Sequence, residues 1–372
     1  MQIEPRKELA DLPPTVHGGQ GWRLAGIEDY SQNLNPMGPP EILGEIVAKS
    51  VADAGHYPDA SCLGVREKLA KYYGIAPENI CMGAGSSEII RNFPHVFIRP
   101  GDSVLLPTPS FAEYTQQCRI AGAQIDYLPL RAENDFHIDV DELFKILESK
   151  HYAAMYICNP NNPTGRVESR EKIMKIVSRC EELGTMVFLD ETLLALVAEV
   201  SSVSMIKYVG QFTNLIIAES YTKSFAIPGM RIGYAISNPD IIREMEKVNL
   251  PWNVGTVEQT VAAHLTEYEM DHPLEAALDM RKESKVMHSQ LEIIGFPVGP
   301  VSDSFFYFVD LAPIGLTGAS FKDRMLKEGF MVRDCASFGP QYESFVRFCV
   351  KDRERNERFV KAVENVLASL GL

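Results

Sequence analysis

Short apolar runs alternate with amphipathic segments between about residues 40 and 260. In the amphipathic segment at 169–184, SREKIMKIVSRCEELG, apolar residues recur at helical spacing and a glycine follows them, as glycine often follows helices. Alternating strands and helices predict a mostly parallel sheet with helices on both faces. The runs predicted as buried strands are 103–109, 153–159, 185–191, 213–220 and 230–237.

The pattern changes after about residue 255, where long helical segments dominate. Three apolar runs, 304–310, 330–335 and 344–350, predict a small sheet, and residues 355–370 predict a closing helix. The first 40 residues are rich in Pro and Gly, and we expect them to pack against this second unit. The prediction is an α/β fold with a large domain at 41–258 and a smaller α+β domain formed by 1–40 and 259–372.

Composition narrows the class of protein and of partner. Of 372 residues, 45% are hydrophobic and 23% are charged, which is typical of a globular protein with a sizeable core. The net charge of −14 disfavours nucleic acid as a partner, although a few local arginines can still bind a small anion. The seven cysteines show neither C-x-x-C nor metal-ligand spacing, and no apolar run could span a membrane. We therefore expect a cytoplasmic protein with reduced thiols, no metal site and no membrane partner.

Polar residues follow several of the predicted strands, at the edge where α/β sheets bind ligands. They are the turn NPNNPTG at 159–165, then Asp190, then Ser220 and Lys223. The loop GAGSSE at 83–88 precedes a helix and could direct amides toward an anion. Each feature alone also fits a plain turn, a helix cap or a solvated charge. Their joint order along the chain is what indicates a site.

One cofactor would use all of these groups. Pyridoxal phosphate needs a lysine that holds it covalently, a carboxylate against the pyridine nitrogen and a donor to the ring oxygen. It also needs hydroxyls, amides and an arginine around its phosphate. The chain offers these chemical types in Lys223, Asp190, Asn162, Ser220 and Arg231.

The motifs NNPTG, FLDE and S-x-T-K-S-F-A-I-P-G-M-R-I-G resemble those of the fold-type I pyridoxal-phosphate enzymes of aminotransferase class I/II. The resemblance covers nearly the whole chain and implies the aspartate aminotransferase-like fold of pyridoxal-phosphate-dependent transferases. It implies that Lys223 binds the cofactor, that Asp190 pairs with the pyridine nitrogen and that Asn162 donates to the ring oxygen. The residues implied around the phosphate are Ser86, Ser87, Ser220 and Arg231.

Further roles come from the same resemblance. Phe111 matches the aromatic residue that stacks on the cofactor ring, although a core phenylalanine is an alternative. Tyr57 matches a tyrosine that reaches the cofactor phosphate of the neighbouring subunit, which implies a homodimer with shared active sites. Arg347 matches the arginine that binds the substrate carboxylate. Leu193 departs from the family pattern, because many relatives have a tyrosine donor three residues after the aspartate.

Two branches of the family look most similar. The segments HGG (17–19), DYSQNLNPMGPP (29–40), LPWNVGTVEQ (250–259) and VRDC (332–335) resemble threonine-phosphate decarboxylase of cobalamin biosynthesis. Histidinol-phosphate aminotransferase shares NPNNPTG and YPD. Resemblance to the decarboxylase implies a substrate site formed by His17, Gly18, Asn33, Asn162, Arg333 and Arg347.

The predicted activity is the decarboxylation of a phosphorylated amino acid by a lyase. O-Phospho-L-threonine would give (R)-1-amino-2-propanol O-phosphate, and O-phospho-L-serine is an alternative substrate. An aminotransferase acting on histidinol phosphate and 2-oxoglutarate is the second hypothesis. A non-catalytic relative that only binds the cofactor is a remote third, disfavoured because Lys223 and Asp190 are both present.

Overall fold

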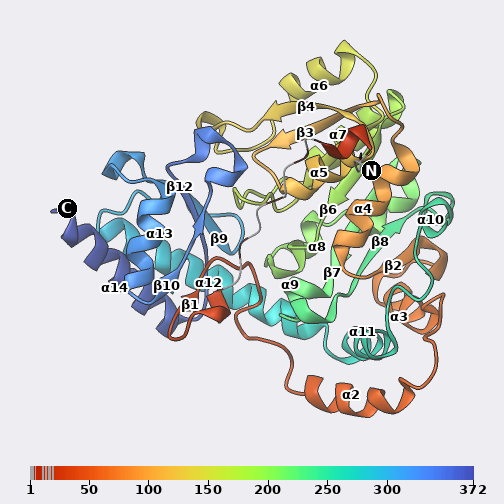
Figure 1. Ribbon diagram of the computed structural model, residues 1–372, viewed down its shortest axis with the longest axis horizontal. Coiled ribbons are helices and arrows are strands. Elements are labelled where there is room, and N and C mark those ends of the chain that lie inside the picture. The colour runs from red at the N-terminus through yellow and green to blue at the C-terminus, as the bar shows by residue number, and fades with distance from the viewer. Residues whose placement is uncertain (1–3, 5, 11, 13–14, 16–17, 19–20) are drawn as a thin grey trace.

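The computed structural model describes residues 4, 6–10, 12, 15, 18 and 21–372. Two units are visible in Figure 1: a larger one around an extended sheet, and a smaller one that contains the blue C-terminal elements. The long helix α12 (Asp271–Ile293) runs from one toward the other. Among the described residues, no helix is long and apolar enough to cross a membrane.

The larger unit is built on a seven-stranded sheet. Its strands, in spatial order, are β2 (Ile80–Gly83), β8 (Gly233–Ser237), β7 (Leu215–Ser220), β6 (Met186–Asp190), β5 (Ala154–Cys158), β3 (Ser103–Thr108) and β4 (Gln124–Pro129). Strand β8 is antiparallel to both of its neighbours, and the other pairings are parallel. The prediction of a helix-covered, mostly parallel sheet is confirmed. All residues of β5 and β7 are buried, because both faces of the sheet carry apolar clusters.

Helices follow the strands as the sequence pattern predicts. The predicted helix at 169–184 is α7 (Arg170–Glu182), and the hydroxyl of Ser169 caps it by accepting from the amide of Lys172 at 3.2 Å. The other α-helices described before residue 270 are α1 (Lys7–Ala10), α2 (Leu43–Ser50), α3 (Leu63–Tyr73), α4 (Ser86–Phe97), α5 (Ala112–Ile120), α6 (Val140–Ser149), α8 (Val200–Val203), α9 (Tyr221–Ser224), α10 (Pro239–Glu246) and α11 (Thr256–Tyr268).

The smaller unit contains an antiparallel sheet in the order β11 (Arg333–Asp334), β12 (Phe345–Cys349), β9 (Phe306–Asp310). An apolar cluster joins this sheet to α12, α13 (Gly318–Lys327) and α14 (Arg353–Ser369). The N-terminal segment contributes β1 (Glu28–Asp29), which pairs in parallel with β10 (Phe330–Met331). Residues from both ends of the chain therefore meet in this unit.

The predicted boundary at 258/259 falls within helix α11, and Val261, Ala262 and Leu265, which follow the boundary, belong to the core of the larger unit. The helix packs against α3 and α2. The two-domain division itself stays a prediction. Core packing places α11 with the larger sheet.

Gly233 allows the loop before α4 to pack against β8. A Cβ atom at Gly233 would lie 2.3 Å from the Ser86 nitrogen and 2.5 Å from the Gly85 carbonyl carbon, and these backbone atoms cannot rotate away. We expect Gly233→Ala to lower the free energy of unfolding by about 2 kcal/mol through overpacking. Urea denaturation would measure this. Gly210→Ala is the control, since no atom of the described chain lies within 4 Å of a Cβ there; an equal effect of both substitutions would contradict the prediction.

Candidate active site

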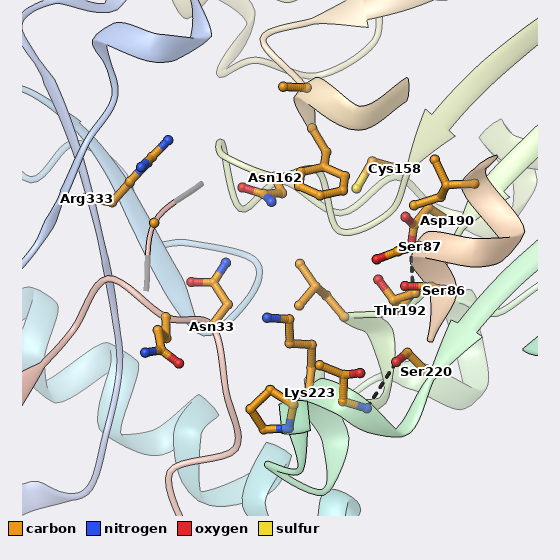
Figure 2. Close-up of a pocket in the computed structure, with 18 of the residues that line it drawn as sticks. Asn33, Ser86, Ser87, Cys158, Asn162, Asp190, Thr192, Ser220, Lys223 and Arg333 are labelled. Carbon is orange, nitrogen blue, oxygen red and sulfur yellow. Dashed lines mark hydrogen bonds between the residues drawn. The ribbon is translucent and has the colours of Figure 1, made fainter. Parts of the chain in front are cut away.

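A cavity of about 360 Å³ lies at the carboxyl ends of the parallel strands and is lined by residues of both units. Figure 2 shows Lys223 pointing into it, with Ser86 and Ser87 toward one side and Arg333 toward the other. All predicted site residues that the structure describes line this cavity, except Tyr57. His17 lies outside the described residues, and the adjacent Gly18 is part of the lining.

Asp190 ends β6 and is buried. The hydroxyl of Tyr114 donates to its Oδ2 at 2.6 Å, and the amide of Thr192 donates to its Oδ1 at 3.0 Å. Burial raises the pKa of Asp190, and these two donors oppose the rise because they stabilise the carboxylate. The sequence motifs did not identify Tyr114, which lies one helical turn after Phe111 and stacks edge-on against it.

Lys223 lies on the short helix α9, which follows β7 directly. The Ser220 hydroxyl caps this helix by accepting from the Thr222 amide at 3.0 Å. The N-terminal segment is hydrogen-bonded to the same helix. Asn35 donates from its backbone amide to the Lys223 carbonyl at 3.0 Å and from its side chain to the Ser224 carbonyl at 2.8 Å. Burial lowers the pKa of Lys223 to about 8, and the charges of Arg347 and Arg231 contribute.

The loop before α4 and Arg231 form one end of the cavity. Ser86 and Ser87 are the first residues of α4, where backbone amides and the helix dipole favour an anion. Arg231 donates to the Ser87 hydroxyl at 3.4 Å and packs on Gly85, where a Cβ would lie 2.4 Å from its Nη2. This end of the cavity can hold a phosphate between hydroxyls, amides and a guanidinium.

Arg347 joins the two units at the cavity. It is buried on β12, and its guanidinium donates to the Asn162 side-chain oxygen and, at 2.6 Å, to the Ser31 carbonyl. The bond to the Asn162 oxygen leaves the amide nitrogen of Asn162 free to donate elsewhere. The Nε of Arg347 is buried and has no hydrogen-bond partner among the described residues. Burial lowers the pKa of Arg347 to about 10.

Arg333 lies directly across from Arg347 in the β11–β12 pairing. Its Nη2 donates to the Ser337 hydroxyl at 2.7 Å, its guanidinium lies 5.9 Å from the Phe338 ring centre, and Gly18 packs against it. Ser337 and Phe338 line the cavity and were not predicted as site residues. Asn33 is buried nearby, and its Oδ1 has no hydrogen-bond partner in the described part of the chain.

The donor set fits pyridoxal phosphate. Lys223 could hold the cofactor covalently, Asp190 could face the ring nitrogen, and Asn162 could donate to the ring oxygen. Phe111 lines the cavity beside Tyr114, as a ring-stacking residue would. The residue three positions after the aspartate, Leu193, is buried in the core of the smaller unit and supplies no polar atom.

The chain belongs to the aminotransferase class I and II family, whose sequence profile matches residues 34–363. Pyridoxal phosphate is the cofactor of this family, and the prediction of this cofactor is confirmed. The chain is thus a pyridoxal-phosphate-dependent enzyme of this class, with the aspartate aminotransferase-like fold.

The similar proteins are named for two different activities. A protein of Caldanaerobacter subterraneus subsp. tengcongensis, provisionally named threonine-phosphate decarboxylase, is 29% identical over 97% of this chain and 96% of its own length. A histidinol-phosphate aminotransferase of Thermoanaerobacter sp. is 30% identical over 95% and 97%. The structure of L-threonine-O-3-phosphate decarboxylase from Porphyromonas gingivalis matches with a TM-score of 0.79 and 25% identity. The match covers 92% of this chain and 100% of that one.

The lowered pKa of Lys223 predicts how fast the cofactor attaches. Only the neutral amine is nucleophilic, so the rate at which apoprotein binds pyridoxal phosphate covalently should rise about tenfold per pH unit and level off near pH 8. Stopped-flow absorbance of the bound cofactor measures this rate, and Lys223→Ala should show no such absorbance. A rate that keeps rising to pH 10 would contradict the prediction.

Tyr114→Phe tests the donor to Asp190. Loss of this bond should raise the pKa of Asp190 further and weaken its hold on the cationic ring, so affinity for pyridoxal phosphate should fall roughly tenfold. Equilibrium dialysis of apoprotein measures the affinity. Tyr152→Phe is the matched control, because Tyr152 donates to Asp126 at the same 2.6 Å but outside the cavity. Equal affinities of both variants would refute a role for Tyr114.

Proposed function

We propose that this enzyme is a lyase that decarboxylates O-phospho-L-threonine to (R)-1-amino-2-propanol O-phosphate. The substrate loses its carboxylate as carbon dioxide, the bonding electron pair stays on the α-carbon, and that carbon takes up a proton. O-Phospho-L-serine differs by one methyl group and is the substrate alternative. Similarity to the protein provisionally named threonine-phosphate decarboxylase and to the structure of L-threonine-O-3-phosphate decarboxylase supports this choice.

The observation that carries the proposal is the charge of the cavity. Its described lining contains four cationic side chains, Lys223, Arg231, Arg333 and Arg347, but a single carboxylate, Asp190. If Arg231 serves the cofactor phosphate, then Arg333 and Arg347 are left for the substrate. Phosphothreonine carries two anionic groups, a carboxylate and a phosphate, and matches two guanidinium groups. Histidinol phosphate has one anionic group and an imidazole, so in the aminotransferase reaction only the two carboxylates of 2-oxoglutarate would match both guanidinium groups.

Substrate orientation selects the reaction. When bound, pyridoxal phosphate withdraws electrons from the bond at the substrate α-carbon that stands perpendicular to its ring. Arg333, held by Ser337 and Phe338, would bind the substrate phosphate. The Nε of Arg347, which has no hydrogen-bond partner among the described residues, would donate to the substrate carboxylate. Two fixed anchors restrict rotation of the substrate, and this restriction can keep the bond to the carboxylate perpendicular to the ring.

Lys223 would supply the proton. Its amine, with a pKa of about 8, exists in both protonation states near neutral pH. A protonated Nζ can therefore deliver a proton to the α-carbon after carbon dioxide has left. The burial that makes the amine nucleophilic also makes it a ready proton donor.

We also propose that the protein acts as a homodimer with shared active sites. Ser87 and Arg231, at the phosphate end of the cavity, are exposed in the single chain. Large apolar side chains are exposed near Tyr57 and near Trp252 in sequence, namely Val51, Leu63 and Leu250. A second copy that covers these side chains would bring Tyr57 to the open phosphate end.

A direct assay distinguishes the reactions. Purified holoenzyme is incubated with phosphothreonine, phosphoserine, or histidinol phosphate plus 2-oxoglutarate, and carbon dioxide and glutamate are measured. We expect carbon dioxide and aminopropanol phosphate from phosphothreonine. Glutamate without carbon dioxide would refute the lyase. It would favour the aminotransferase, which similarity to the 30% identical histidinol-phosphate aminotransferase of Thermoanaerobacter sp. supports.

The same assay tests Arg333. Arg333→Gln removes charge-assisted bonds to the substrate phosphate, so KM for phosphothreonine should rise about 10- to 100-fold. Arg324→Gln is the control, since Arg324 lies half-buried on α13, outside the cavity lining, and donates to the Ser369 hydroxyl. An unchanged KM in Arg333→Gln would show that the substrate phosphate binds elsewhere.

A further inference from the structure

Tyr57 and Trp252 form a stacked pair on the surface. Their ring centres are 4.2 Å apart with planes inclined by 21°, although 73% of Tyr57 and 45% of Trp252 are exposed. An aromatic stack restricts the rotation of both side chains. The orientation of the Tyr57 ring is thus restricted at the protein surface, and Tyr57 does not line the cavity of its own chain.

The backbone at Trp252 is in the left-handed region, with φ of 57°. This conformation is disfavoured for any residue with a Cβ atom, so the surrounding structure must hold it. Asn253 supplies part of that hold, because its side chain donates to the Glu88 carboxylate at 2.8 Å and to the Met82 carbonyl at 3.2 Å. On the other side, Gln259 donates to the carbonyls of Asp59 and Val254 and links the loops of Tyr57 and Trp252.

The same contacts reach the phosphate end of the cavity. Glu88 also accepts a hydrogen bond from the Ala84 amide at 2.7 Å, and Ala84 belongs to the loop that leads into Ser86 and Ser87. The loop that orients Trp252 is therefore fastened to the loop that would bind the cofactor phosphate. That phosphate end is exposed in a single chain, at Ser87 and Arg231.

We propose that Trp252 is a positioning residue: its ring holds Tyr57 so that the tyrosine hydroxyl donates to the cofactor phosphate bound by a second copy of this chain. The inference rests on the proposed homodimer. Tyr57 without its stack would rotate freely and lose conformational entropy on binding, so the stack should strengthen the partner's hold on the cofactor.

The test compares Trp252→Ala with Trp252→Phe, which keeps a ring for stacking. Analytical ultracentrifugation gives the oligomeric state, and equilibrium dialysis of apoprotein gives the affinity for pyridoxal phosphate. We expect both variants to be dimers, with affinity about tenfold weaker in Trp252→Ala and near wild type in Trp252→Phe. Tyr268→Ala is the control, since Tyr268 is 65% exposed and its ring lies tilted against that of His264 rather than against Tyr57. It should bind the cofactor as the wild type does.

A double-mutant cycle shows whether Trp252 acts through Tyr57. In a Tyr57→Phe background, which lacks the hydroxyl, Trp252→Ala should cause no further loss of affinity. An equal loss in both backgrounds overturns the inference, as does undiminished affinity of a dimeric Trp252→Ala. If Trp252→Ala is monomeric, Trp252→Phe provides the test. The inference is also overturned if Trp252→Phe loses as much affinity for pyridoxal phosphate as Trp252→Ala does. A monomeric wild type overturns the homodimer itself, while the carbon dioxide assay tests the lyase reaction separately.

Discussion

The electrostatic cost of holding Lys223 near Arg347 and Arg231 is the constraint on which the site depends. Burial removes the water that would stabilise the charges of Lys223 and Arg347, and Asp190 is the single carboxylate in the described lining. The chain tolerates the imbalance because the pKa of Lys223 falls and because anions can enter the cavity. The cofactor phosphate and an anionic substrate would complete the charge balance that the protein leaves open.

Arg347 connects this charge balance to the arrangement of the two units. Its guanidinium bonds to Asn162 of the larger unit and to Ser31 of the N-terminal segment, while its strand belongs to the smaller unit. Asn35 likewise joins the N-terminal segment to the turn that carries Lys223. The segments that would bind substrate and cofactor are thus joined by hydrogen bonds, so a displacement of one segment alters the position of the other.

The sequence predicted strands that are buried on both faces, because such strands are continuous apolar runs. It missed β4, an edge strand with a largely part-exposed pattern, and the four-residue β2. Motif residues such as Asp190 and Lys223 were found because their order along the chain is distinctive. Tyr114 was missed because no motif marks it, although its spacing from Phe111 places it one helical turn further. The contribution proposed for Tyr57 needs a second chain, which a single sequence cannot position.

Chemical identification of the lysine that carries the cofactor is the decisive experiment for this site. Holoenzyme is treated with borohydride, which fixes the covalent link between lysine and pyridoxal phosphate, and tryptic peptides are mapped by mass spectrometry. We expect one modified residue, Lys223, and no modification in Lys223→Ala. Modification of a different lysine, or none in protein that retains bound cofactor, would contradict it.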